Sequence, residues 1–215
     1  MFGHLLSQIL PLGPYEAYHL CCAFIGFLGV VAAYRIGSLL GGGPAGFLAA
    51  LFLILTPRYY GHVFNNPKDI PFVVFYLWGL YWIIRDLEVL PALPRNWILK
   101  TGLAVGLTLG CRVNGFVLFF YMALFWGIRY VQLIKIGHPV KPMVQSFAIQ
   151  LVFCVAVAYA VMLPLWPWAL LHPITGPFEA LEYFSKFLEP HFSFFDGRYV
   201  LNHDVPWFYV SKCWC

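Results

Sequence analysis

The chain has 215 residues, of which 61% are hydrophobic, 20% aromatic and only 10% charged. Soluble domains carry about 25% charged residues, so this composition excludes an ordinary soluble domain and predicts a membrane-embedded chain. The formal net charge is only +4, and the basic residues are scattered along the chain. No nucleic-acid partner is therefore expected.

Neither the N-terminus nor the cysteines indicate processing or metal binding. Residues 1–20 lack a basic n-region and a small-residue cleavage site, so they predict a short interfacial segment rather than a signal peptide. Four of the six cysteines lie in apolar segments, where they are expected to act as small hydrophobic residues. Cys213 and Cys215 have no spacing typical of a zinc site or a disulfide framework. The cysteines therefore predict no metal site, and we expect no cofactor.

Apolar runs of about 20 residues, the length needed to cross a membrane, recur along the chain. The first run ends at the glycine-rich turn GGGPAG, and later runs are separated by NNPKD, by RDLEVLPALPRN, by CRVNG and by a basic loop. We predict an all-α, polytopic transmembrane bundle within residues 1–168. Its six expected spans are residues 17–40, 45–64, 71–84, 97–112, 115–129 and 144–168.

Residues 169–215 no longer have the composition of a span. EALEYFSKFL is typical of an amphipathic helix, and the remainder is expected to be an irregular loop rich in aromatic residues. We interpret this segment as an extension of the bundle on one side of the membrane and not as an independent domain.

The distribution of basic residues predicts the orientation of the bundle. Short loops and span ends on one side carry seven basic residues, against three on the other side. The side richer in lysine and arginine is expected to face the cytoplasm. GHVFNNPKDIPF, CRVNG and the tail then share the outer face. The first set is Arg35, Arg85, Arg95, Lys100, Arg129, Lys135 and Lys141, and the second is Arg58, Lys68 and Arg112.

The densest polar cluster, Asn65, Asn66, Lys68 and Asp69, lies between two apolar runs. One interpretation is an ordinary solvated turn punctuated by prolines. The other is the wall of an anion-binding cavity, because charged groups near membrane depth usually face a cavity or a partner. Arg58 and His62 precede this turn at intervals of four, which places them with Asn66 on one helical face.

Two interpretations are also open for Arg112 with Asn114 and for the tail. Arg112 is either a snorkelling arginine at a helix end or a guanidinium that binds a phosphate in the same outer cavity. The tail FFDGRYVLNHDVPWFYV is either an interfacial loop with an aromatic belt or a lid that helps to bind a sugar. Under the second interpretation, Asp204 and Trp207 are its candidate binding residues.

Several stretches resemble bacterial membrane glycosyltransferases of family 39, the group of the protein O-mannosyltransferases. The resemblance rests on RIGSLLGGGPAG, LTPRYYGH, NNPKDIPF and VPWFY, and it covers about residues 15 to 210. It implies a bundle of the GT-C type with its site on the outer face and a polyprenyl-phosphate sugar as donor. It also implies transfer with inversion, an acidic second-loop position matched by Asp69, and phosphate binding by Lys68 and Arg112.

Two departures from the family pattern lead to a further expectation. The family begins with an additional span and a first outer loop bearing an acidic pair, and here Glu16 is the one acid near that position. The family also continues beyond the VPWFY motif. We therefore interpret the chain as a fragment, with a site that is incomplete on its own.

The resulting hypothesis is a membrane hexosyltransferase of the bacterial plasma membrane that acts on an acceptor hydroxyl of a protein, lipid or glycan at the outer face. Asp69 is the expected catalytic carboxylate. The expected substrate-binding residues are Arg58, His62, Asn65, Asn66, Lys68, Arg112, Asn114, Asp204 and Trp207. A divalent metal is left open. The alternatives are a transporter or channel lined by the same charges, and an inactive, truncated relative.

Overall fold

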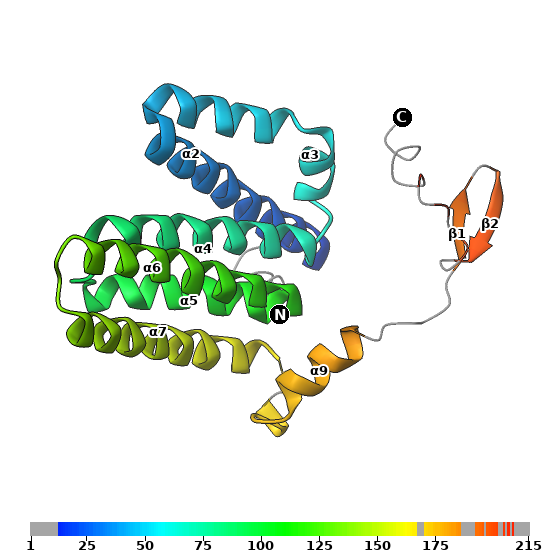
Figure 1. Cartoon of the computed structure of the whole chain (residues 1–215). Coiled ribbons are helices and arrows are strands. Elements are labelled where there is room, and N and C mark those ends of the chain that lie inside the picture. The colour runs from blue at the N-terminus through cyan, green and yellow to red at the C-terminus, as the bar shows by residue number, and fades with distance from the viewer. Residues whose placement is uncertain are drawn as a thin grey trace. The chain divides into compact units, whose positions relative to one another are not determined.

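A computed structural model describes residues 13–166, 170–185, 192–195, 197–201, 204, 206 and 208. The chain forms two compact units, Met1–Pro173 and Ile174–Cys215. The first unit is the helical bundle that the sequence predicts, and Figure 1 shows its helices running back and forth between two ends. We call the end that contains Asp69 the acidic-loop end and the other the basic end.

The first helix, α2 (Pro14–Leu55), consists of two arms that fold back on each other (Figure 1). Its backbone leaves the helical region at Gly41, with φ −143° and ψ 18°, and at Gly42, with φ 78° and ψ −178°. A positive φ is easily adopted by glycine, which has no Cβ. The expected turn within residues 41–46 is therefore confirmed as the break between the arms.

Small residues let the two arms of α2 approach closely. A Cβ atom added to Gly37 would lie 2.8 Å from the Ala45 carbonyl oxygen, and one added to Gly46 would lie 2.6 Å from the Tyr34 carbonyl oxygen. Such backbone approach is typical of helix pairs in membranes, where packing rather than hydrophobic transfer holds helices together.

The second arm of α2 ends earlier than the expected span 45–64. Thr56 is extended, with ψ 112°, because a residue that precedes a proline avoids the helical region. A separate short helix, α3 (Pro57–Val63), follows and packs on the first arm, where the Tyr59 hydroxyl donates to the Gly26 carbonyl at 2.7 Å. The expectation that Arg58 and His62 belong to the apolar helix is thus wrong, since both lie in α3.

Four antiparallel helices complete the bundle: α4 (Asp69–Val89), α5 (Arg95–Cys111), α6 (Phe116–Lys135) and α7 (Val140–Met162). A 3-10 turn, η1 (Val113–Gly115), joins α5 to α6, and a second, η2 (Leu163–Leu165), follows α7. Each span predicted after residue 70 is matched by one of these helices. Their ends differ, because α4 and α6 continue through residues assigned to polar loops.

The core of the bundle lies between α4, α5, α6 and α7. Trp126, Leu118 and Met122 of α6 are fully buried, and they pack in one cluster with Ile83 of α4 and Val105 of α5. Close contact between α5 and α7 depends on Gly102 and Gly106, which face α7 backbone. These helices form a compact group, and α2 packs against it through α4.

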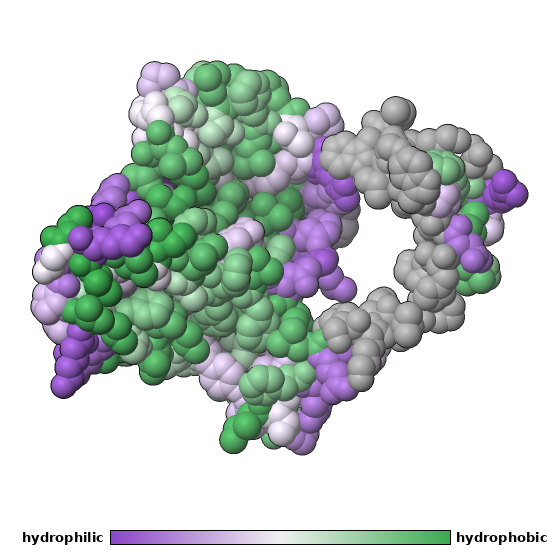
Figure 2. All heavy atoms as spheres, in the orientation of Figure 1, coloured by the Kyte–Doolittle hydropathy of each residue, from purple (hydrophilic) through white to green (hydrophobic). Residues whose placement is uncertain are grey.

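Among the described residues, four helices are long and apolar enough to cross a membrane: Tyr15–Leu55, Asp69–Val89, Val113–Lys135 and Val140–Leu165. The first of these contains both arms of α2. Helix α5, which corresponds to the expected fourth span, is shorter, with 17 residues, and is not among the four. In the most apolar stretch of α2 only 6% of the residues are buried within the protein. Figure 2 shows the apolar surface over the middle of the bundle and hydrophilic residues toward its two ends. The protein is an integral membrane protein.

The second unit contains a helix and a β-hairpin. Helix α9 (Gly176–Ser185) confirms the expected amphipathic helix, displaced by about one turn from EALEYFSKFL. Strands β1 (Phe192–Phe195) and β2 (Arg198–Leu201) pair antiparallel, with Phe192 opposite Leu201. The expectation of an irregular loop is wrong here. Gly197, with φ 79°, lies at the turn, and an Asp-Gly pair is a typical sequence for a two-residue hairpin turn.

Candidate functional site

The acidic-loop end is organised by one side chain, Asn66, in the loop between α3 and α4. Its Oδ1 atom accepts hydrogen bonds from the backbone N–H groups of Lys68 at 3.2 Å and Asp69 at 2.9 Å. Asparagine is favoured at such positions because its carbonyl satisfies N–H groups that a helix start leaves unpaired. The residue therefore fixes the first turn of α4, and with it the position of Asp69.

The amide nitrogen of Asn66 binds the flanking residues. It donates to Asp69 Oδ2 at 2.7 Å and to His62 Nδ1 at 3.2 Å. Because His62 Nδ1 accepts this bond, the proton of the neutral imidazole is on Nε2. His62, Asn66 and Asp69 thus form one connected chain of polar groups, although Asn66 lies beyond the end of α3.

Arg112 reaches this chain from another helix. It follows α5 with an extended backbone, φ −154° and ψ 144°, and its Nη2 atom pairs with Asp69 Oδ1. The two residues are 43 positions apart in the sequence. Both carboxylate oxygens of Asp69 are therefore engaged, one by Arg112 and the other by Asn66.

The Asp69–Arg112 pair is accessible. The Asp69 and Arg112 side chains are 49% and 45% exposed, respectively. An ion pair this exposed is worth at most about 1 kcal/mol of stability. Arg112 has five N–H donors, so the guanidinium keeps donors for a ligand while one of its nitrogens holds Asp69. The pair fits the binding of a polar, anionic molecule better than a structural role.

His19, which is not among the site residues predicted from the sequence, also lies at this end. Its Nδ1 atom is 2.6 Å from the Phe64 carbonyl oxygen, so it must carry the proton and donate. The ring stacks edge-on against Tyr15, with centroids 4.1 Å apart. A histidine near the start of an apolar span was the available indication, but the sequence does not show that the chain after α3 returns to the start of α2.

The segment that follows α7, η2 and Trp166, packs closely against the end of α5, next to Arg112. Trp166 donates its indole N–H to the Gly110 carbonyl at 3.0 Å, and a Cβ at Gly110 would collide with the Leu165 side chain. Gly115 is buried, and a Cβ there would lie 2.9 Å from the Leu109 backbone nitrogen. These contacts fix the turn that presents Arg112.

The other residues that the sequence predicts to bind substrate are not part of this hydrogen-bonded chain. In the described part of the chain, the exposed side chains of Arg58, Asn65, Lys68 and Asn114 form no hydrogen bond or ion pair. Asp204 belongs to the second unit, where its backbone N–H donates to Leu201 at 2.9 Å. Trp207 lies outside the described residues.

No metal centre is formed by the residues that the structure describes. Among them, no three histidine, cysteine, aspartate or glutamate side chains lie close enough to hold an ion together. Asp69 and His62 are linked through Asn66, and this pair alone supplies too few ligands for a typical site.

A bundle of membrane-length helices with an accessible acid–base pair at one end defines a membrane protein with a polar site at that end. The profile of one protein family, described as dolichyl-phosphate-mannose-protein mannosyltransferase, matches residues 9–168. The chain belongs to this family of membrane glycosyltransferases, which confirms the resemblance. Comparisons with curated proteins and with solved structures give no match. The matched range contains Asp69 and Arg112 but neither Asp204 nor Trp207.

Proposed function

We propose that the protein transfers a sugar from a polyprenyl-phosphate donor to an acceptor hydroxyl at the outer face of a bacterial plasma membrane. The observation that carries the proposal is the half-exposed Asp69–Arg112 pair, which joins two helices at one end of the bundle. Membership of a membrane glycosyltransferase family supports the reaction class. The smaller number of basic residues at this end supports its outward orientation.

The proposed reaction is a single displacement with inversion. A bond forms between the acceptor oxygen and the anomeric carbon while the bond from that carbon to the phosphate oxygen breaks. The acceptor hydroxyl loses its proton, and the polyprenyl phosphate leaves with the bonding electron pair. The protein must therefore orient a hydroxyl on one side and stabilise a phosphate on the other.

In this scheme Asp69 orients the acceptor hydroxyl and assists its deprotonation. Asn66 holds the carboxylate, at 2.7 Å from Oδ2, and Arg112 holds its other oxygen. The free lone pairs on the two oxygens remain available to a substrate hydroxyl. His62 supports the same chain of hydrogen bonds by orienting Asn66.

Arg112 is proposed to bind the donor phosphate through the guanidinium donors that Asp69 does not use. Planar N–H forks match phosphate oxygens and bind them in bidentate fashion. The exposed side chains of Lys68 and Arg58 add cations at the same end of the bundle. The long polyprenyl tail would remain in the lipid around the bundle, whose surface is apolar (Figure 2).

The test is sugar transfer from a labelled polyprenyl-phosphate mannose by the membrane-inserted protein. Asp69→Asn and Arg112→Ala are each expected to lower the rate about 100-fold or more. Arg95→Ala, at the basic end, is the control and is expected to keep the wild-type rate. If both site variants transfer sugar as well as the control, the assignment of the site is wrong. A wild-type protein without transfer activity would overturn the proposed reaction.

A further inference from the structure

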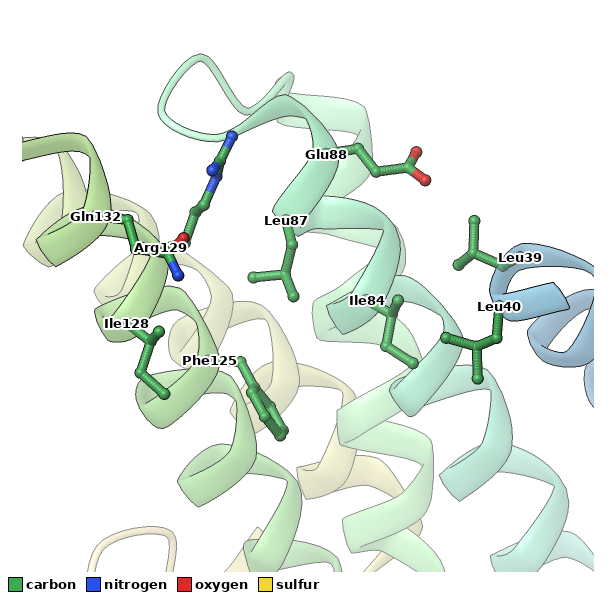
Figure 3. Close-up of a pocket in the computed structure, with 9 residues that line it drawn as sticks. All are labelled: Leu39, Leu40, Ile84, Leu87, Glu88, Phe125, Ile128, Arg129 and Gln132. Atoms are coloured by element: carbon green, nitrogen blue, oxygen red, sulfur yellow. The ribbon is translucent and has the colours of Figure 1, made fainter. Parts of the chain in front are cut away.

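A groove opens on the bundle surface at the basic end, far along the helices from Asp69. It has a volume of about 380 Å³ and is formed by α2, α4 and α6. Figure 3 shows α4 between the other two helices, with Leu39 and Leu40 of α2 on one side and Phe125 and Ile128 of α6 on the other. Its walls are thus aliphatic and aromatic.

The groove has a cation at its edge. Arg129 and Gln132, one turn apart on α6, lie together at the side away from α2 (Figure 3). The Arg129 Nε atom is buried, and among the described residues the side chain has no hydrogen bond or ion pair. The Arg129 side chain as a whole is only partly buried, so its guanidinium donors are available to an anionic ligand at this edge of the groove.

The acids of this end do not neutralise Arg129. Glu88, at the opposite edge of the groove, pairs with Arg85 at 3.4 Å. Asp86 is fully buried and accepts a hydrogen bond from Thr101 at 2.7 Å. Against these two acids the basic end carries seven lysine and arginine residues. Both acids are thus bound by other residues, and among the described residues the charge of Arg129 has no acidic partner.

We propose that this groove binds an anionic phospholipid, with the phosphate at Arg129 and Gln132 and one acyl chain along the apolar walls. Basic pockets between membrane helices bind anionic headgroups. The bound lipid would lie at the end of the bundle opposite the Asp69 site, so the proposal is independent of the proposed sugar transfer.

The headgroup must supply the selectivity. Apolar walls gain nothing by exchanging one lipid chain for another, because the surrounding tails are equally apolar. A basic residue near the membrane surface contributes about 1 kcal/mol to binding an anionic lipid, which corresponds to about a fivefold change in affinity. Binding should therefore respond to the charge at position 129 and to the shape of the groove, and not to overall charge.

The experiment is a native mass spectrometry titration of the full chain in detergent micelles with phosphatidylglycerol and, separately, with phosphatidylcholine. The wild type is expected to bind phosphatidylglycerol more tightly. Arg129→Gln should weaken that binding about fivefold and leave phosphatidylcholine binding unchanged. Lys135→Gln is the matched control, since it removes one charge from an exposed position on the same helix. It should leave both affinities unchanged.

A second variant tests the groove without changing its charge. Leu40 is 72% exposed, so Leu40→Trp can be accommodated while its ring occupies the groove. Leu40→Trp should weaken phosphatidylglycerol binding. If Arg129→Gln does not fold, the result with Leu40→Trp alone tests whether the groove binds this lipid. The proposal is overturned if Leu40→Trp binds phosphatidylglycerol normally, or if Lys135→Gln weakens binding as much as Arg129→Gln. It is also overturned if a polyprenyl phosphate binds at Arg129 more tightly than phosphatidylglycerol.

Discussion

The two ends of the bundle use polar residues in opposite ways. At the acidic-loop end, Asp69 and Arg112 are about half exposed and keep unused donors and acceptors. At the basic end, Asp86 is buried against Thr101, and Gln150 joins Tyr130 to the Pro91 carbonyl with distances of 3.0 and 2.8 Å. Buried polar groups that bind one another hold helices together, whereas accessible ones are available to substrates.

This comparison predicts that mutations at the two ends affect different properties, activity at one end and stability at the other. Changes at the acidic-loop end should lower activity with little loss of stability. Changes within the buried polar contacts of the basic end, or between tightly packed arms, should lower stability while each folded molecule keeps its activity. The predictions below run from the largest expected effect to the smallest.

Arg112→Ala should lower kcat/KM for the polyprenyl-phosphate donor about 100-fold, because the leaving phosphate loses its guanidinium partner. Arg112→Lys should recover only part of the loss, since an ammonium group cannot bind phosphate in bidentate fashion. The thermal midpoint should change little in both variants, as expected for an exposed pair. Equal activity of the lysine variant and the wild type would contradict the proposed bidentate contact.

Gly46→Ala should destabilise the protein by about 1–3 kcal/mol, because the added Cβ collides with Ser38 and lies 2.6 Å from the Tyr34 carbonyl oxygen. Gly61→Ala in α3 is the control, since nothing lies within 4 Å of its Cβ. That change should be neutral or stabilise by up to about 1 kcal/mol. Thermal unfolding in detergent measures both, and equal midpoints would show that the arms of α2 are less tightly packed than described.

Gln150→Leu should cost about 1 kcal/mol of stability, the range of hydrogen bonds between membrane helices. It removes one hydrogen bond each from the Pro91 carbonyl and the Tyr130 hydroxyl, which both keep Ser146 as a partner, and it preserves the volume of the side chain. Gln145→Leu, at an exposed position of the same helix, should have no comparable effect. Sugar transfer per folded molecule should remain at the wild-type rate in both, and a selective loss of transfer in Gln150→Leu would place that residue in the working site.

Asn114→Ala should have the smallest effect, less than about twofold on transfer or binding, because the exposed side chain forms no hydrogen bond in the described structure. A donor titration with this variant separates Asn114 from Arg112, which lies two residues earlier. A loss approaching that of Arg112→Ala would make Asn114 a direct substrate contact.

The sequence predicted the spans better than the contacts. Apolar length and the interruptions at NNPKD and CRVNG were enough to place Asp69 and Arg112 at one end of the bundle, because consecutive spans alternate in direction. Their ion pair was not predicted. It depends on the extended backbone at Arg112 and on the tight packing of Gly115 against Leu109, which no local pattern reports.

Other features were missed for identifiable reasons. Pro57 was read as part of a continuous span, although a proline forces the preceding residue out of the helical region. Asn66 was grouped with its neighbours by polarity, and its role in fixing Asp69 appears only in the folded loop. His19 became a candidate only through its 2.6 Å contact with Phe64, 45 residues away.

The most direct measurement compares two carboxylates on the same helix. Asp69→Asn and Asp86→Asn make the same chemical change at opposite ends of α4, and sugar transfer from the polyprenyl donor is measured per folded molecule. The account predicts a loss of about 100-fold or more for Asp69→Asn and less than about twofold for Asp86→Asn. Equal activities in the two variants, or a larger loss for Asp86→Asn, would contradict it.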